Sequence, residues 1–270
     1  MKILLNNNDL NEALYNVSNL GFVPTMGSLH KGHISLIRRS LKECNKTIVS
    51  IFINPTQFNN KNDYKKYPRN TKRDLLILKK LKVNFVFLPK KRHIYNYRRK
   101  SKIKLSKTDK IMCAKYRKGH FEGVIDVMDR LTKIIGPKKI FMGEKDYQQL
   151  FLVKNYLLKK YKIKVISCRT IRGDNKVALS SRNFLLNKKE LSIAGKLTQD
   201  LILFKKKLKN RSNIKKAIFL KKKEMSKSFK IYFDYLELRN KNNLKIDYKI
   251  KNSKLFTAFY LNNIRLIDNF

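Results

Sequence analysis

The first 170 residues alternate between short apolar runs and amphipathic runs. The apolar runs lie at 20–23, 47–53, 84–88, 139–142 and 162–168. Between them, apolar residues recur at helical spacing, as Val124, Val127 and Leu131 do in the stretch 119–135. The run 47–53 is almost wholly apolar, which is typical of a central parallel strand covered on both faces. The pattern predicts an α/β fold, a Rossmann-like parallel sheet with helices on both faces.

Some stretches between these runs are less regular. Leu10, Leu14 and Val17 predict a short helix in the polar segment 1–20. We expect a loop at 63–69, a helix at 74–81, and a short strand at 103–105 within the basic segment 90–118.

The pattern changes after residue 183. All five prolines and eight of the nine glycines precede it. Lysine-rich helical patterns at 188–207 and 214–226 follow, and then alternating runs at 231–238 and 255–261. We therefore predict two domains, 1–178 and a smaller α+β domain at 179–270.

The junction after the first apolar run carries the strongest chemical signal. It reads V-P-T-M-G-S-L-H-K-G-H over 23–33, and an amphipathic run follows from Ile34. A glycine-bearing loop between a strand and a helix is where backbone and imidazole groups contact phosphates. His30 and His33 are three residues apart, so both rings can face one ligand. An H-x-G-H sequence alone is more often a simple turn, but this frame favours nucleotide binding.

Three other junctions carry candidate binding residues. Gln57 follows the second apolar run, where open α/β sheets bind ligands, although a solvated turn gives the same letters. The stretch G-E-K-D at 143–146 offers a lysine to phosphate and carboxylates to Mg²⁺, and a surface turn is the alternative. The hydroxyls and guanidinium at 180–182 suit phosphate oxygens, and a helix N-cap explains them equally well.

Composition narrows the class of protein. The chain has 270 residues with 42% hydrophobic content and a net charge of +45, and basic residues prevail to a similar degree before and after residue 183. An even spread argues against a dedicated nucleic-acid surface, so we expect no specific nucleic acid partner. No apolar run approaches the ~20 residues needed to span a bilayer, so we expect no membrane. Three widely spaced cysteines predict neither disulfides nor structural zinc, and the polar N-terminus is unlike a signal peptide, so we expect a cytoplasmic location.

The motifs, in this order, resemble one family, the pantothenate synthetases (pantoate–β-alanine ligases) of the HxGH nucleotidyltransferase superfamily. The matching stretches are P-T-M-G-S-L-H-K-G-H at 24–33, S-I-F-I-N-P-T-Q-F at 50–58, Y-P-R at 67–69, G-H-F-E-G-V at 119–124, G-E-K-D-Y-Q-Q-L at 143–150, L-S-S-R-N at 179–183 and R-L-I-D-N at 265–269.

The resemblance implies an ATP-dependent ligase that joins pantoate to β-alanine through a pantoyl adenylate. It implies Mg·ATP as the nucleotide, a small C-terminal lid domain and a homodimer. His30, His33 and Lys145 would be catalytic, and Gln57 and Gln149 would bind pantoate or β-alanine. No residue is assigned as a direct metal ligand. The implied ATP-binding residues are Met26, Gly27, Ser28, Leu29, His30, Lys31, Gly32, His33, Gly143, Glu144, Lys145, Asp146, Ile171, Leu179, Ser180, Ser181 and Arg182.

Two other classes remain open. Another H-x-G-H nucleotidyltransferase would share the first motif but has no need of Gln57 or of the 143–150 stretch. A nucleic-acid-binding protein would account for the charge but predicts clustered basic residues among exposed aromatics.

Overall fold

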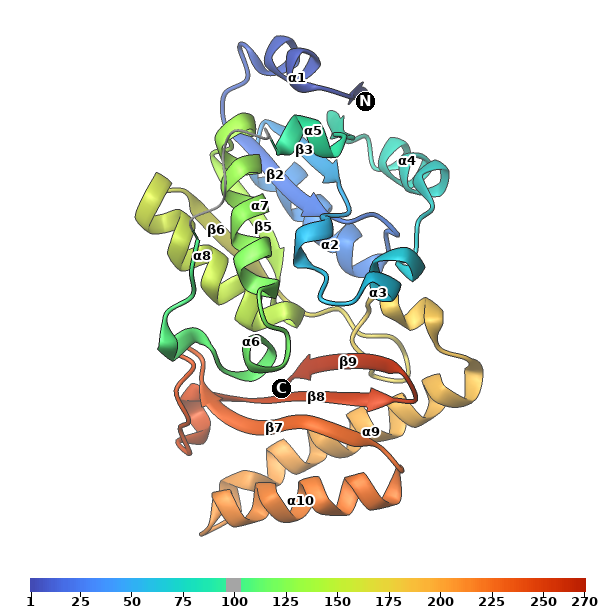
Figure 1. Ribbon diagram of the computed structural model, residues 1–270, viewed down its shortest axis with the longest axis vertical. Coiled ribbons are helices and arrows are strands. Elements are labelled where there is room, and N and C mark those ends of the chain that lie inside the picture. Colours follow the sequence, from blue (N-terminus) through green and yellow to red (C-terminus); the bar gives the residue numbers. More distant parts are fainter. Residues whose placement is uncertain (96–102) are drawn as a thin grey trace. The chain divides into compact units, whose positions relative to one another are not determined.

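The computed structural model describes residues 1–95 and 103–270, and Figure 1 shows its elements. It divides into two compact units, Met1–Arg169 and Thr170–Phe270. The predicted boundary was at 178/179. Residues 170–178 belong with the second unit because Arg172 forms a bidentate ion pair with Asp268, at 2.6 and 2.9 Å, within that unit.

The first unit contains a six-stranded sheet in the order β1-β4-β3-β2-β5-β6, with every described pairing parallel. This confirms the predicted Rossmann-like sheet. The strands are β1 (Lys2–Leu4), β2 (Leu20–Thr25), β3 (Lys46–Ile51), β4 (Phe85–Phe87), β5 (Lys139–Gly143) and β6 (Lys164–Cys168).

Helices connect these strands. α2 packs on β2 and β5, α8 packs on β5 and β6, and α7 packs on α8. The α-helices of this unit are α1 (Asn7–Leu14), α2 (Lys31–Glu43), α3 (Lys61–Lys66), α4 (Thr71–Lys80), α5 (Lys91–Ile94), α6 (Met112–Tyr116), α7 (His120–Ile135) and α8 (Tyr147–Tyr161).

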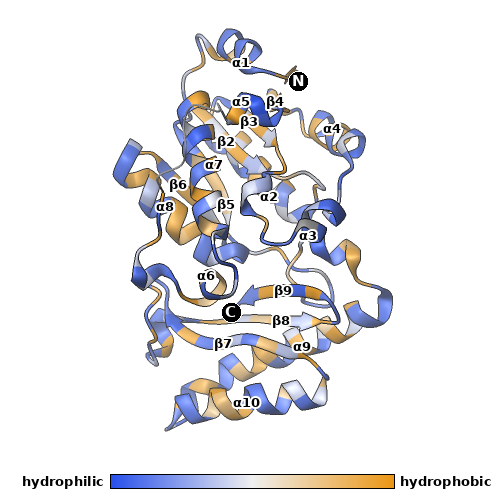
Figure 2. Ribbon diagram, in the orientation of Figure 1, coloured by the Kyte–Doolittle hydropathy of each residue, from blue (hydrophilic) through white to orange (hydrophobic). Residues whose placement is uncertain are grey.

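One face of the sheet shows how the sequence builds the core. Three neighbouring strands, β3, β2 and β5, each contribute a fully buried side chain, namely Val49, Val23 and Phe141. These side chains belong to one apolar cluster with Ile37 of α2 and Leu78 of α4. Figure 2 shows helices with orange and blue residues side by side, as amphipathic elements require. Burial of these apolar stripes fixes the sheet that carries the loops described below.

Two local predictions were wrong, and one strand was missed. Residues 61–66 form α3, because Asn60 caps it by accepting from the Asn62 N–H at 2.7 Å. Residues 103–105 carry no strand in the described chain, and part of the basic segment 90–118 lies outside the described residues. The edge strand β1 was not predicted, since its three residues are too few to show a period.

The second unit is a three-stranded antiparallel sheet in the order β7-β8-β9, packed with α9 and α10 around one apolar cluster. This confirms the predicted smaller α+β part. Its elements are α9 (Lys188–Lys207), α10 (Ile214–Ser228), β7 (Tyr232–Asn240), β8 (Ser253–Leu261) and β9 (Ile264–Asn269). α9 begins where predicted because Asn187 and Glu190 cap each other's backbone N–H groups. No described helix in either unit has the length and apolarity to cross a bilayer.

Candidate active site

The strand order brings two of the predicted loops together. β2 and β5 are neighbours, with Phe22 paired to Ile140, and the chain proceeds outward from them in opposite directions across the sheet. Such a switch point leaves a crevice at the carboxyl ends of the two strands. The loop 26–30 follows β2, and the stretch 143–146 comprises the last residue of β5 and the turn after it, so both lie at this crevice.

The loop after β2 has an unusual backbone held by a buried carboxylate. Gly27 and Ser28 both have positive φ, 79° and 53°. Glycine adopts this conformation freely, whereas serine is strained there. Asp74, on α4 and 1% exposed, accepts from the Ser28 N–H at 2.7 Å and from the Leu29 N–H at 2.8 Å. These two bonds to a charged acceptor hold the loop in place.

The two histidines form a reciprocal cap at the start of α2. The Gly32 N–H donates to His30 Nδ1 at 3.1 Å, and the His30 N–H donates to His33 Nδ1 at 3.4 Å. An accepting ring nitrogen carries no proton, so the neutral rings hold theirs on Nε2. The ring centroids are 4.1 Å apart. The two rings therefore lie side by side at the start of α2, and each carries its proton on Nε2.

The surroundings of the histidines keep them neutral. Burial lowers the pKa of His30 to about 4, with a further decrease from the Lys145 ammonium. Burial lowers the pKa of His33 to about 3, and its neighbour His30 adds to this. Asp146 opposes both shifts, which places Lys145 and Asp146 within electrostatic reach of both rings. At neutral pH both histidines are uncharged hydrogen-bond donors.

The stretch after β5 supplies the charges of the site. Lys145 Nζ lies 3.4 Å from Asp146 Oδ1, and the Asp146 side chain is 46% exposed. Glu144 accepts from Ser167 Oγ on β6, at 2.5 Å. A half-exposed carboxylate beside a lysine and two imidazoles suits Mg²⁺ held mainly by phosphates and water. No group of three or more His, Cys, Asp or Glu side chains able to hold a metal occurs in the part of the chain that the structure describes.

Gln57 also reaches the loop after β2. It lies in the turn Pro55–Gln57 beyond β3, is buried, and its Nε2 lies 3.0 Å from Met26 Sδ. Its backbone carbonyl lies 2.7 Å from His120 Nδ1, on α7. Gln57 is thus held from both sides at the edge of the crevice.

The two adjacent glutamines of α8 differ in role. Gln148 is buried, and its amide accepts from the Cys113 N–H at 3.0 Å and donates to the carbonyls of Ile111 and Asp109. It fixes the segment before α7. Gln149, the predicted substrate ligand, is half-buried in the first turn of α8, directly after the 143–146 stretch.

Several of the candidate ATP-binding residues have side chains that are buried or that make contacts close by in the chain. The Leu29 side chain lies in the core and Lys31 is exposed, so the loop offers a ligand mainly backbone and imidazole groups. In the second unit, Ser180 Oγ accepts from the Arg182 N–H at 3.2 Å and caps a 3₁₀ helix, Ser181–Leu185. Ser181 is buried and Arg182 is half-buried. Ile171 and Leu179 belong to this unit too, paired by a backbone bond of 2.9 Å.

A pocket of about 270 Å³ opens beside Met26, Gly27 and Ser28, within the first unit. Arg69 and Lys91 contribute positive charge to its lining, and Asp74 contributes the carboxylate already bound to the loop. The volume is below the ~300–1,000 Å³ of sites for drug-sized ligands, so it suits a small organic molecule.

Sequence reasoning missed the residues that support the site. One signal was present for Asp74, which lies four residues before Leu78 and so shares its buried helix face. Gly123 had a signal as well, since a glycine inside a helical pattern often marks a close packing contact, and here a Cβ would lie 2.5 Å from the Thr56 carbonyl oxygen. Asn54 holds Gln57 by donating to its Oε1 at 3.2 Å, and no pattern in the sequence marks that contact.

Comparisons with known proteins find the same family along the whole chain. The family model described as pantoate-beta-alanine ligase matches residues 2–270. A pantothenate synthetase of Azobacteroides pseudotrichonymphae is 39% identical over 260 residues, which is 93% of this chain and 91% of that protein. One from Francisella tularensis subsp. mediasiatica is also 39% identical, over 97% of this chain and 92% of its own length.

Solved structures agree. The pantothenate synthetase of Thermus thermophilus superposes with a TM-score of 0.92 at 29% identity, covering 100% of this chain and 99% of that one. The pantoate-beta-alanine ligase of Francisella tularensis, crystallised with beta-gamma ATP and beta-alanine, gives a TM-score of 0.84 at 34% identity, over 100% of this chain and 97% of its own. By its motifs, its fold and these matches, this chain belongs to the pantoate-beta-alanine ligase family.

Proposed function

We propose that the protein condenses pantoate with β-alanine at the expense of ATP, through a pantoyl adenylate. A pantoate carboxylate oxygen attacks the α-phosphorus of ATP, and the bond to pyrophosphate breaks. The β-alanine amine then attacks the acyl carbon, loses a proton, and releases AMP as the acyl C–O bond breaks. Two alternatives account for less. A cytidylyltransferase does not require Gln57, and a nucleic-acid-binding protein does not require this crevice.

The observation that carries the proposal is the group of donors at the switch point. His30 and His33 present two Nε2–H groups, and Lys145 adds a positive charge within electrostatic reach of both. In-line attack at phosphorus spreads negative charge over the non-bridging oxygens and the departing pyrophosphate. Fixed donors at that position stabilise the transition state more than bound ATP. Mg²⁺ would enter with the nucleotide as Mg·ATP, near Asp146.

Two glutamines complete the proposed site on the side of pantoate. Gln57 and Gln149 are neutral amides that both donate and accept, so they suit a ligand with hydroxyls and a carboxylate. The segment 179–182 would approach the triphosphate as part of the lid. The resemblance also favours a homodimer and a cytoplasmic location, and light scattering on the purified protein tests the first.

One assay tests the reaction. AMP formation is followed with ATP, pantoate and β-alanine, and each substrate is omitted in turn. We expect AMP only with all three, and pantoate-dependent exchange of pyrophosphate into ATP without β-alanine. Release of pyrophosphate with CTP in place of ATP, or no dependence on pantoate, would contradict the proposal.

A further inference from the structure

The orientation of the Gln57 amide follows from a chain of hydrogen bonds that starts at the backbone. Asn54 is 1% exposed, and the Thr56 N–H donates a hydrogen bond of 3.2 Å to one of the two end atoms of its side-chain amide. The atom that accepts from a backbone N–H is the oxygen. The other atom faces the Gly123 carbonyl at 3.1 Å, so it is the nitrogen. Backbone groups have fixed donor and acceptor roles, and the assignment is therefore unique.

The assignment passes from Asn54 to Gln57. The second N–H of Asn54 Nδ2 donates to one atom of the Gln57 amide, at 3.2 Å, and that atom must be Oε1. The Gln57 NH₂ group then points toward Met26, on the loop at the crevice. Gln57 thus turns its N–H donors toward the site, while its oxygen is turned toward Asn54.

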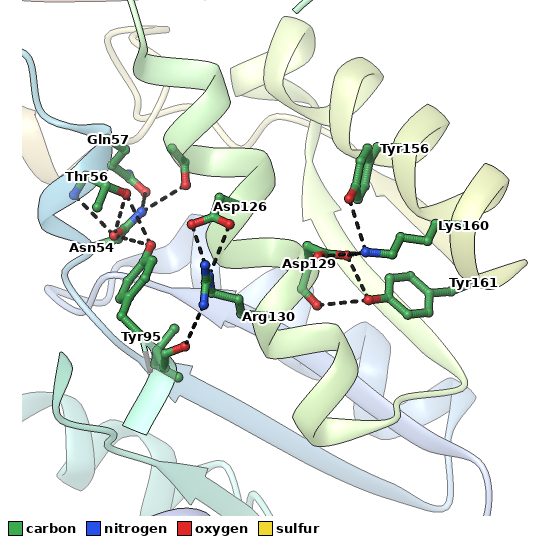
Figure 3. A network of polar contacts seen from close by, with 12 residues as sticks. Asn54, Thr56, Gln57, Tyr95, Asp126, Asp129, Arg130, Tyr156, Lys160 and Tyr161 are labelled. Carbon is green, nitrogen blue, oxygen red and sulfur yellow. Dashed lines mark hydrogen bonds and ion pairs between the residues drawn. The ribbon is translucent and has the colours of Figure 1, made fainter. Parts of the chain in front are cut away.

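Tyr95 holds this arrangement at its outer end (Figure 3). Its hydroxyl donates to Asn54 Oδ1 at 2.8 Å and lies 3.2 Å from Thr56 Oγ1. The Arg130 guanidinium lies 4.8 Å from the centroid of the Tyr95 ring, and both carboxylate oxygens of Asp126 accept from Arg130 Nε at 3.1 Å. Burial raises the pKa of Tyr95 to about 12, so the phenol keeps its proton.

We propose that Tyr95 is a positioning residue for the acid substrate. Backbone groups set which way the Asn54 amide faces, and the Tyr95 hydroxyl restrains its movement by donating to the same oxygen, which keeps the Gln57 NH₂ turned into the site. Gln57 therefore recognises an acceptor oxygen of the acid, its carboxylate or a hydroxyl, and not a donor. This inference rests on the proposed function, in which Gln57 binds pantoate.

The first test replaces the phenol hydroxyl alone. Tyr95→Phe keeps the ring on Arg130 and removes one hydrogen bond, so we expect the KM for pantoate to rise about three- to tenfold. The KM for ATP and kcat should stay within about twofold. Thr56→Val removes the 3.0 Å hydrogen bond from Thr56 Oγ1 to Asn54 Oδ1. It should also raise the KM for pantoate.

The second test reverses the chemistry of Gln57. If Gln57 donates, Gln57→Glu places a carboxylate oxygen against an acceptor of the substrate, and the KM for pantoate should exceed that of Gln57→Ala by about tenfold. If Gln57 accepted instead, the glutamate would bind as well as the parent. That result would overturn the inference.

A matched control and a double variant separate the explanations. Tyr156→Phe removes a phenol that accepts from Lys160 at 3.3 Å on the other side of α7, and should leave every constant unchanged. In a Gln57→Ala background, Tyr95→Phe should have no further effect on the KM for pantoate. An unchanged KM in Tyr95→Phe beside a raised KM in Gln57→Ala refutes the role of Tyr95 alone. An unchanged KM in Gln57→Ala refutes the pantoate assignment itself.

Discussion

Replacing Asp74 by asparagine tests whether the loop at the crevice depends on one buried carboxylate. Asp74 accepts from two backbone N–H groups, those of Ser28 and Leu29, one with each oxygen. An asparagine has a single amide oxygen, so its NH₂ group would face one of these N–H donors. The variant changes no volume, and its effect therefore reports the hydrogen bonds.

The magnitude follows from the geometry. A hydrogen bond to a charged group contributes about 1.5–3 kcal/mol, and a buried donor left unpaired costs about 1–3 kcal/mol. Removal of the buried charge offsets part of this loss. We expect Asp74→Asn to lower the free energy of unfolding by about 2–3 kcal/mol. Urea unfolding followed by circular dichroism measures the change.

The effect on activity separates position from charge. If Asp74 acts by holding Ser28 and Leu29, pantoate-dependent ATP–pyrophosphate exchange should fall about ten- to a hundredfold, as displaced catalytic loops do. If it acted only as a negative charge near ATP, its removal would tighten ATP binding and leave exchange unharmed. The control is Asp9→Asn, because the half-buried Asp9 also accepts a backbone N–H, that of Leu5 at 2.8 Å. A parent rate and parent stability in Asp74→Asn would refute the reasoning.

Four further predictions concern the donors, the substrate amides, pH and charge. His33→Ala and Lys145→Ala should each lower the kcat of exchange by about 10²–10³-fold with little change in ATP binding, as loss of a transition-state donor does. Gln57→Ala and Gln149→Ala should raise the KM for pantoate more than that for ATP. The depressed pKa values of His30 and His33 mean that unfolding binds protons below pH 6.5, so their contribution to stability is complete above that pH and is lost toward pH 3. The melting temperature of His33→Gln should therefore fall less between pH 6.5 and 4 than that of the parent. The charge of +45 should give DNA binding that is weak, independent of sequence and steeply dependent on salt.

Each of these has a clear contrary outcome. Parent exchange rates in His33→Ala and Lys145→Ala would mean that the H-x-G-H stretch is only a turn. Equal rises in the KM for pantoate and the KM for ATP would indicate that the two glutamines stabilise the fold and do not bind pantoate. Identical pH profiles of melting for His33→Gln and the parent would show that the imidazole is not buried neutral. DNA binding that is specific and resists physiological salt would restore the nucleic-acid hypothesis.

The sequence predicted elements well where a long apolar stripe defines them. α9 at Lys188–Lys207 and α7 at His120–Ile135 agree with the predicted 188–207 and 119–135. Burial of a stripe outweighs local preferences over that length. β1 and α3 are short. β1 is determined by its pairing with β4, and α3 by the cap that Asn60 provides. Such determinants leave no period in the sequence.

The site divides in the same way. Motif loops are contiguous, so the positions 26–33 and 143–146 could be read directly, and strand order explains why they meet. The supporting contacts join residues far apart in the chain, as Asp74 with Ser28 and Tyr95 with Asn54 do. Their partners depend on how helices pack on the sheet, which a single sequence does not encode in any local pattern.

Gly123 has a consequence for any attempt to redesign the acid that this protein accepts. A methyl group at that position would lie 2.5 Å from the Thr56 carbonyl oxygen and 3.0 Å from the Gln57 nitrogen, and neither backbone atom can rotate away. α7 and the turn at Pro55–Gln57 are therefore coupled as one rigid body. In the proposed acid site, trimming Gln57 leaves this close approach of helix and turn unchanged. A redesign that moves the turn therefore has to move the helix with it.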